Sequence, residues 1–251
     1  MGVSNPTSLP VTSPVTNPVL ARGENPRTIF SSADLRFWGN LDNRVDGTPP
    51  DITTLTDLTA FGRDPTQTSE GARPELEDLG GKNYASLSGG RFWATSAGTD
   101  YIAANTKALS IWFVGSPIFG PVRTFFDLGE GTTTDTGMSF FFVAGNVLQA
   151  RVLTTGGLVV LDTGAYTTIP TDIFEVRLDG VNLKIYANGI ELASVAETGT
   201  MANGCETLAI GRDIAGGGGS GRVREVAIVA GDVAPTVLQR QRMLAYLQEN
   251  Q

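Results

Sequence analysis

The segment FEVRLDGVNLKIYANGIELASVAE, residues 174–197, carries the strongest fold signal in this chain. It contains three runs in which apolar and polar residues alternate, separated by Asp179-Gly180 and Asn188-Gly189. Asp-Gly and Asn-Gly pairs readily adopt the positive φ angles that two-residue type I′ turns require. The segment is therefore predicted to be an antiparallel meander of three strands.

The alternation also predicts which side chains of the meander are buried. Phe174, Val176 and Leu178 alternate with Glu175, Arg177 and Asp179, and Leu183 and Ile185 alternate with Asn182, Lys184 and Tyr186. Antiparallel sheets commonly bury one face and leave the other in water. We expect the apolar set to fill a core and the polar set to be solvated.

Further strand patterns recur on both sides of the meander. They lie at residues 29–38, 84–87, 90–94, 109–115, 122–128, 138–143, 147–153, 158–163, 206–212 and 222–229. Residues 39–82 show no clear period and are expected to form a long irregular region. Many short strands without helices between them predict an all-β fold, either a two-sheet antiparallel sandwich or a barrel.

One helix is predicted, at residues 235–248. Pro235 suits its first turn, and Val237, Leu244 and Leu247 share one face at helical spacing. With this helix, residues 29–251 are of a size that all-β folds often build as one domain.

Composition excludes several kinds of chemistry. The 251-residue chain contains no histidine, which rules out Ser-His-Asp and Cys-His nucleophiles and histidine-ligated metals. Its one cysteine, Cys205, has no cation beside it in the sequence and is expected to be an inert thiol. The formal charge of −8 argues against binding to nucleic acid or to anionic membranes.

Residues 1–28 form a compositionally separate arm. Prolines recur every four residues, which disfavours helix and sheet interior and favours extended chain. The arm is either a free tether or a segment that docks on a partner. The residues expected to dock are Pro6, Pro10, Val11, Pro14, Val15, Pro18 and Val19. The arm lacks a basic signal-peptide start, so we expect synthesis in the cytoplasm without a signal peptide.

Several motifs resemble, in order, those of the LamG-like, or concanavalin A-like lectin-glucanase, jelly-roll family. They are Phe61-Gly62-Arg63-Asp64 with Thr66-Gln67, Arg73-Pro74, Tyr84–Leu87 through Tyr101-Ile102, Leu109–Gly115, Phe125–Gly129, Lys184–Gly189, Ile210–Arg212 with Gly221–Val229, and Gln239–Leu247. The resemblance covers about residues 30–250 and leaves the arm without a counterpart. It implies a jelly roll with one C-terminal helix.

The family includes hydrolases, and these place two glutamates around an aspartate on one strand because retaining cleavage needs two close carboxylates. This chain lacks that pattern. Its nearest approach, Glu75-Leu76-Glu77-Asp78, is expected in a loop. We therefore expect no enzymatic activity.

Acidic and aromatic residues are the candidates for metal and sugar sites. Asp100, Asp127 and Asp135 lie near predicted strand ends, where calcium ligands could gather, but ordinary turn and surface roles are expected for them, and no cofactor is predicted. The aromatic candidates for sugar stacking are Trp38, Trp93, Trp112, Tyr101, Tyr166 and Tyr186. Core filling is expected for the three tryptophans, and Tyr166, in the loop 164–170, is the best exposed candidate.

The resemblance and the arm together suggest a structural role. Similar single-module members occur as surface proteins of tailed-phage virions, so we expect a non-enzymatic capsid decoration or fibre protein on the virion surface. Its partners would be virion or assembly proteins met through the arm, and the chain could form a homo-oligomer. The alternative is a lectin-like module that binds cell-surface glycans, and the third hypothesis is a hydrolase.

Overall fold

The computed structural model describes residues 24–46, 50–95, 100–117, 123–130, 135–167, 172–212, 214, 218–219 and 221–250. Its elements, in order, are α1 (Pro26–Ile29), β1 (Leu35–Asp46), β2 (Ile52–Asp57), the 3-10 helix η1 (Glu70–Ala72), β3 (Glu75–Leu79), β4 (Lys82–Ser86), β5 (Trp93–Ala94), β6 (Ala108–Pro117), β7 (Arg123–Gly129), β8 (Met138–Val143), β9 (Val147–Thr154), β10 (Gly157–Ala165), β11 (Asp172–Leu178), β12 (Asn182–Ala187), β13 (Ile190–Ala196), β14 (Thr207–Ile210), β15 (Gly221–Gly231) and α2 (Val237–Glu249).

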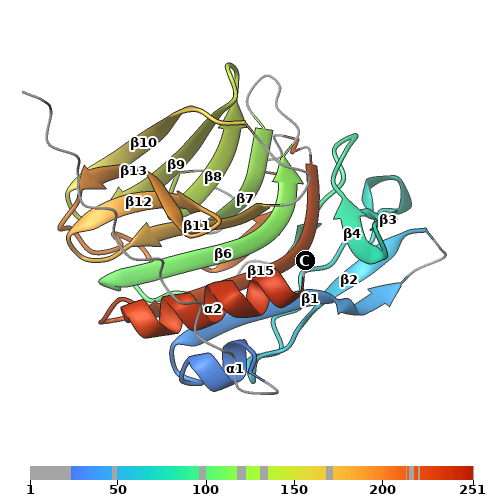
Figure 1. The fold of residues 1–251 in the computed structure, drawn as a ribbon, viewed down its shortest axis with the longest axis horizontal. Helices are drawn as coiled ribbons and strands as arrows, with labels where there is room; N and C mark the ends of the chain where they lie inside the picture. The colour runs from blue at the N-terminus through green and yellow to red at the C-terminus, as the bar shows by residue number, and fades with distance from the viewer. Residues whose placement is uncertain are drawn as a thin grey trace, which may run out of the picture.

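The strands form two antiparallel sheets stacked as a sandwich (Figure 1). The larger sheet has the order β13-β12-β11-β6-β15-β1-β2, with β4 paired to β15 and β3 to β4. The smaller sheet has the order β10-β9-β8-β7-β14-β5. The predicted all-β sandwich with a C-terminal helix is confirmed.

The space between the sheets is filled by aromatic side chains. Phe113 on β6 lies 4.4 Å from Phe125, 5.1 Å from Phe140 and 5.0 Å from Phe174, measured between ring centres. Offset and edge-to-face pairs at such distances add to the free energy of burial. The apolar set predicted for the meander belongs to this core, since Phe174, Val176, Leu178, Leu183 and Ile185 are all fully buried.

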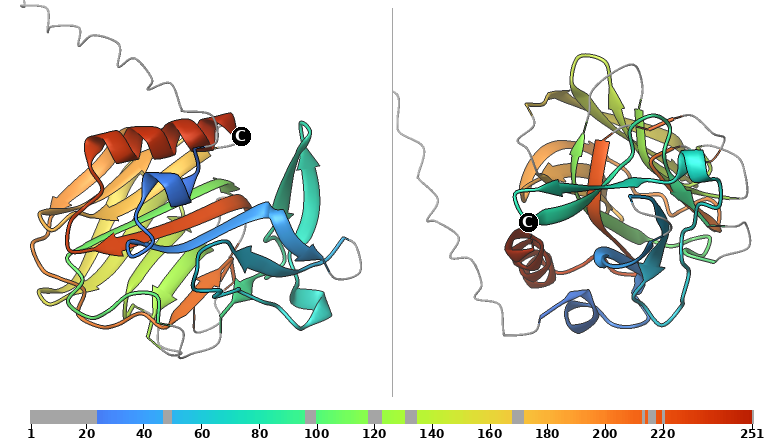
Figure 2. Two further views of the ribbon diagram at one scale, coloured as in Figure 1. Left: turned by 90° about the horizontal axis from the view of Figure 1, so that it is seen from below. Right: turned by 90° about the vertical axis from the view of Figure 1, so that its right-hand side faces the viewer.

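A second core lies outside the larger sheet. Helix α2 runs along that outer face beside α1, as Figures 1 and 2 show. Trp38 and Trp112 from the sheet pack with Phe30, Met243 and the other buried members of this cluster. The outer core explains why β11 is buried on both faces.

The expectation of a solvated outer face on the meander is wrong. Glu175 and Arg177 are only 5% and 8% exposed, because side chains of α2 and of the neighbouring strands cover them. The alternation within β11 cannot reveal a helix that packs on its polar side.

The two turns of the meander differ from each other. Asn188 and Gly189 have φ angles of 50° and 82°, as the predicted type I′ turn requires. In the β11–β12 connection Leu178 pairs with Leu183, and Asp179 N donates to Asn182 O at 3.0 Å, so the two turn residues are Gly180, at φ 81°, and Val181. The predicted two-residue turn lies one position later than Asp179-Gly180, because the Asp179 carboxylate accepts hydrogen bonds from the backbone N–H groups of Val181 and Asn182.

The region before residue 84 is more regular than its sequence predicts. Residues 26–29 form α1, capped by Asn25 with Pro26 in the first turn, so the strand predicted at 29–38 begins only at Leu35. Three further strands, β2, β3 and the start of β4, occupy the region 39–82 that was expected to be irregular. Register shifts within β1 interrupt the period of two on which strand prediction depends.

The C-terminal helix starts later than predicted. Thr236 caps it, and its hydroxyl accepts a hydrogen bond from the backbone of Gln239, so Pro235 lies before the first turn. Leu247 is buried as expected, whereas Val237 is 69% exposed. None of the described helices is long and apolar enough to span a membrane.

Candidate functional site

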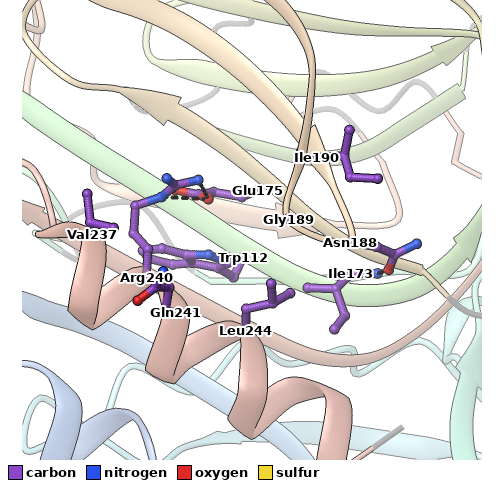
Figure 3. Close-up of a pocket in the computed structure, with 10 residues that line it drawn as sticks. All are labelled: Trp112, Ile173, Glu175, Asn188, Gly189, Ile190, Val237, Arg240, Gln241 and Leu244. Carbon is purple, nitrogen blue, oxygen red and sulfur yellow. Dashed lines mark hydrogen bonds and ion pairs between the residues drawn. The ribbon is translucent and has the colours of Figure 1, made fainter. Parts of the chain in front are cut away.

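A cavity of about 290 Å³ lies between α2 and the meander (Figure 3). Its walls are Trp112 of β6, Ile173 and Glu175 of β11, Asn188, Gly189 and Ile190 of the β12–β13 hairpin, and Val237, Arg240, Gln241 and Leu244 of α2. This volume is at the lower end of the range for small-molecule pockets.

The hairpin wall of the cavity is held in place by Asn188. Its side-chain oxygen accepts a hydrogen bond from Ile173 N at 2.9 Å, and its amide nitrogen donates to Asp172 at 2.7 Å. Next to it, Gly189 approaches α2 so closely that an added Cβ would lie 2.5 Å from Leu244 Cδ2. The turn is therefore fixed against the helix at a position that only glycine fits.

The polar wall of the cavity is an ion pair. Arg240 donates to both carboxylate oxygens of Glu175, with a shortest distance of 2.6 Å, and its guanidinium lies 4.3 Å from the ring centre of Tyr186. Burial alone would lower the pKa of Arg240, but the hydrogen bond and the charge of Glu175 outweigh it, so this pKa is raised. Arg240 therefore keeps its positive charge beside Glu175.

The hydroxyl of Tyr186 extends this polar wall away from the cavity. Arg177 donates to it at 2.6 Å, and it donates in turn to Glu191 at 3.0 Å. Burial raises the pKa of Tyr186 to about 12, so the phenol stays neutral and keeps its proton for Glu191. This network holds the Glu175–Arg240 pair in one geometry.

The rest of the lining is apolar or unengaged. Trp112, Ile173 and Leu244 form an apolar surface on the sheet and helix sides, while Ile190 and Val237 lie at the mouth and are 68% and 69% exposed. Gln241 makes no side-chain hydrogen bond to any residue of the described chain. The arrangement suits a small ligand with one apolar face and several hydroxyl groups.

The residues that the sequence predicted for docking are not tested by this geometry. Pro6, Pro10, Val11, Pro14, Val15, Pro18 and Val19 all lie outside the described residues. Docking by the arm stays a prediction.

The two glutamates considered for hydrolysis lie on β3, so the expected loop is wrong. Glu75 forms an ion pair with Arg91, and Glu77 forms one with Arg222 on β15. These pairs tie β3 and β4 to the sandwich, and β15 supplies arginine rather than a carboxylate opposite Glu77.

The three aspartates considered for calcium are separated. Asp127 is buried and accepts hydrogen bonds from Ser139 Oγ at 2.5 Å and Ile214 N at 2.9 Å, while Asp135 lies 3.4 Å from Arg151. Within the described ranges no three histidine, cysteine, aspartate or glutamate residues lie close enough to hold a metal ion.

The aromatic residues are largely where the sequence predicts. Trp38, Trp93 and Trp112 are 8%, 0% and 2% exposed, which confirms that they fill cores. Tyr166 is half-buried, because it packs on Phe174 at 5.9 Å and hydrogen-bonds to Asp172. It is therefore a poor platform for stacking a sugar.

Sequence reasoning missed the cavity itself. The Asn188-Gly189 pair predicts only a turn, and no sequence pattern singles out Arg240 or Gln241. Glu175 alternates with apolar residues as an ordinary solvated charge would, so no local pattern marks the cavity.

No protein-family model matches the chain, and no curated protein matches it. Solved structures do match. They include botulinum neurotoxin type C in a study of its interaction with two ganglioside molecules (TM-score 0.57, 14% identity) and the serotype D ligand-binding domain with N-acetylneuraminic acid (TM-score 0.57, 10% identity). A third is the binding domain of neurotoxin DC with rat synaptotagmin II (TM-score 0.58, 12% identity).

These alignments cover 86–87% of this chain and 52% of the neurotoxin chains, so it spans about half their length. The serotype D structure is described as a ligand-binding domain and the DC structure as a binding domain. At such low identity the likeness concerns the fold alone, and the chain shares the β-sandwich architecture of these proteins.

Proposed function

We propose that this chain is a carbohydrate-binding, lectin-like module and that the cavity between α2 and the Asn188-Gly189 hairpin holds the sugar. The observation that carries the proposal is the pairing of an apolar surface, Trp112 with Leu244, and a fixed ion pair, Glu175 with Arg240, in one small cavity. A sugar ring offers the matching surfaces, with C–H groups on one face and hydroxyls at its rim.

The chemistry favours hydroxyl-bearing ligands over purely apolar ones. Charged donors and acceptors form stronger hydrogen bonds than neutral ones, and a preformed ion pair loses little freedom when a hydroxyl binds to it. Gln241 adds an amide that has no partner among the described residues. The structural neighbours described with ganglioside and with N-acetylneuraminic acid give independent support for a glycan.

The test compares two variants on the same helix. Gln241→Phe fills the cavity, whereas Gln248→Phe places the same ring on an exposed part of α2 outside it. On a glycan array followed by calorimetric titration, we expect a saturable ligand that Gln241→Phe weakens at least about tenfold, or about 1.4 kcal/mol, and Gln248→Phe leaves unchanged.

Two results would reject the proposal: no glycan that binds saturably, or a glycan whose affinity both variants retain. Thermal unfolding of each variant verifies that the sandwich remains folded, because a phenylalanine at either position is tolerated by a helix.

The role in a virion stays a separate prediction. Incorporation into particles, with virion proteins as partners, is expected to require residues 1–28, and normal incorporation of a chain without them would contradict it. A glycan-binding jelly roll and a docking arm are compatible in one protein.

A further inference from the structure

Two arginine side chains meet over one aromatic ring at the start of the larger sheet. Arg36 lies on β1, and Phe61 and Arg63 lie in the loop that follows β2. The guanidinium carbon of Arg63 is 4.0 Å from the centre of the Phe61 ring, and that of Arg36 is 5.9 Å from it. Arg63 also lies 5.1 Å from the ring centre of Tyr101. Two positive charges are thus held close together in a protein whose formal charge is −8.

The loop that presents Phe61 and Arg63 is fixed by the carboxylate of Asp57. This carboxylate accepts hydrogen bonds from the backbone N–H groups of Trp38, Thr59 and Arg63 at 3.2, 2.9 and 3.0 Å. It also accepts one from the Thr59 hydroxyl at 2.8 Å. On the far side of the loop, the hydroxyl of Tyr101 donates to Arg63 O at 2.9 Å. The nearest acid therefore holds the loop backbone and does not pair with either guanidinium group.

The two guanidinium groups keep free hydrogen-bond donors. Arg63 Nη1 donates to the backbone oxygen of Arg36 at 3.4 Å, and Arg36 Nε is buried without an acceptor among the described residues. Neither side chain forms an ion pair with a carboxylate of the described chain, in contrast to Arg91, Arg151, Arg222 and Arg240. An unpaired donor that is buried costs free energy, and more so on a charged group. An anion that accepts from both side chains would recover this cost.

The electrostatics of Arg63 favour an anion at the same place. Burial is the largest cause that lowers the pKa of Arg63, and the charge of Arg36 lowers it as well. Together they outweigh Tyr101, Asp57 and Asp100, which raise it. A negative charge beside two guanidinium groups stabilises the charged form of both.

We propose that Arg36 and Arg63 bind a small oxyanion, which is a sulfate, a phosphate or a carboxylate group, beside the ring of Phe61. Guanidinium groups bind such anions through charge-assisted hydrogen bonds that are often paired. Phe61 is 39% exposed, so its ring also offers an apolar contact to the molecule that carries the anion. The site shares no residue with the cavity between α2 and the hairpin.

Titration of the full-length wild-type chain tests the site directly. Arginine Nε–H signals are followed by NMR spectroscopy while sodium sulfate, phosphate or acetate replaces sodium chloride at constant ionic strength. We expect the signals of Arg36 and Arg63 to shift saturably, with one shared dissociation constant, for at least one of the three anions. Arg240, which pairs with Glu175, should not respond. The order of the affinities distinguishes tetrahedral anions from carboxylates.

A matched pair of variants separates a built site from general attraction. Arg36→Gln and Lys107→Gln each remove one positive charge, and Lys107 is an exposed residue beside Gly180 in the β11–β12 turn. Arg36→Gln should weaken the affinity at least about tenfold, whereas Lys107→Gln should leave it unchanged. Arg63 is left in place because its side chain also contacts the backbone of β1.

Three results would overturn the proposal. They are signals of Arg36 and Arg63 that do not shift, shifts that grow without saturating, and an affinity that Arg36→Gln retains or that both variants weaken equally. The wild-type titration decides the matter even where Arg36→Gln does not fold. It contains no glycan, so its outcome is independent of the proposed sugar cavity.

Discussion

Glu225 on β15 is a carboxyl group held away from water. It is 1% exposed, and it accepts hydrogen bonds from Trp38 Nε1 at 2.6 Å and Asn40 Nδ2 at 3.0 Å. The hydroxyl of Tyr246 on α2 also contacts it, and Arg224 is the nearby cation. Burial outweighs these partners and raises the pKa of Glu225 from 4.5 to about 7. The fold therefore prefers its protonated form.

This shift predicts how stability depends on pH. An acid whose pKa is raised on folding destabilises the protein only when ionised, so the penalty is absent below about pH 4.5 and complete above about pH 7. Its full size is about 3 kcal/mol, from a shift of about 2.5 units. We expect the difference in the free energy of unfolding between Glu225→Gln and the wild type to shift in favour of the variant as the pH rises from 4.5 to 7.

Urea unfolding of both proteins across this range measures the difference. Glu249→Gln, which removes a carboxylate from the exposed end of α2, is the matched control and should run parallel to the wild type. A constant offset between Glu225→Gln and the wild type from pH 4.5 to 8 would contradict the raised pKa.

At the scale of elements, the contact between the β12–β13 hairpin and α2 depends on one missing side chain. Gly189→Ala would strain a residue at φ 82° and place Cβ 2.5 Å from Leu244 Cδ2. Left-handed strain and overpacking together are expected to cost about 2–4 kcal/mol of stability. Chemical denaturation measures this loss.

The control for the Gly189 variant is Gly80→Ala, which has φ 65° and open space around its Cβ position. It should lose only about 1–2 kcal/mol from backbone strain. Leu244→Ala should relieve part of the overpacking that Gly189→Ala causes, so the double variant should lose less stability than the sum of the two single losses. Strict additivity would show that the added methyl group at position 189 does not contact the Leu244 side chain.

The α1 segment predicts where the body of the protein begins. Pro26 and Ile29 are buried, Phe30 stacks 5.5 Å from Trp112, and the domain boundary expected at residue 28 falls within this helix. A chain that starts at residue 24 should be more stable than one that starts at residue 29 by about 2 kcal/mol or more, because the latter lacks the Asn25 cap and Pro26. Equal midpoints in thermal unfolding would contradict this.

Strands were predictable where their period was intact. The strand predicted at 138–143 is β8 with the same bounds, and the meander strands differ from β11, β12 and β13 by a residue or two. Prediction failed at β1, because its bulges shift the alternation of apolar and polar residues. It also failed at β2, because its Thr-rich sequence has no such alternation. Both gain their order from pairing with strands distant in the chain, which no local pattern records.

The cavity could not be predicted for a similar reason. Glu175 and Arg240 are 65 positions apart, and each looks like an ordinary solvated charge in its own segment. They meet only because α2 lies across β11, and the direction of that crossing depends on Trp112, Met243 and Leu247 packing together. A tertiary contact of this kind sets the site, whereas the jelly roll follows from strand patterns along the whole chain.

At the scale of the whole molecule, Cys205 reports on the integrity of the sandwich. The thiol is fully buried, and burial together with nearby Asp127 and Glu130 raises its pKa from 9.0 to about 12. Because the thiolate is the reactive form, its fraction falls roughly a thousandfold from this shift alone. A thiol reagent should label the folded chain only as fast as the chain opens.

A moved cysteine provides the comparison. In Cys205→Ser combined with Val233→Cys, the thiol lies at a site where the native side chain is 82% exposed, and it should react at once in native buffer. Wild-type labelling should accelerate with denaturant in step with unfolding. Rapid labelling of Cys205 in native buffer would show that the sheets separate locally.

The pairing of the first strand with the last has a consequence for biosynthesis. Trp38 on β1 and Glu225 on β15 are in contact although 187 positions separate them. During translation β1 therefore emerges from the ribosome long before β15, the strand it pairs with, has been synthesised. Leu35, Phe37 and Trp38, which are buried in the folded protein, stay exposed to water in the meantime. Nascent or truncated chains, rather than the finished protein, are then the aggregation-prone species, and a chaperone that holds the first strand would raise the yield.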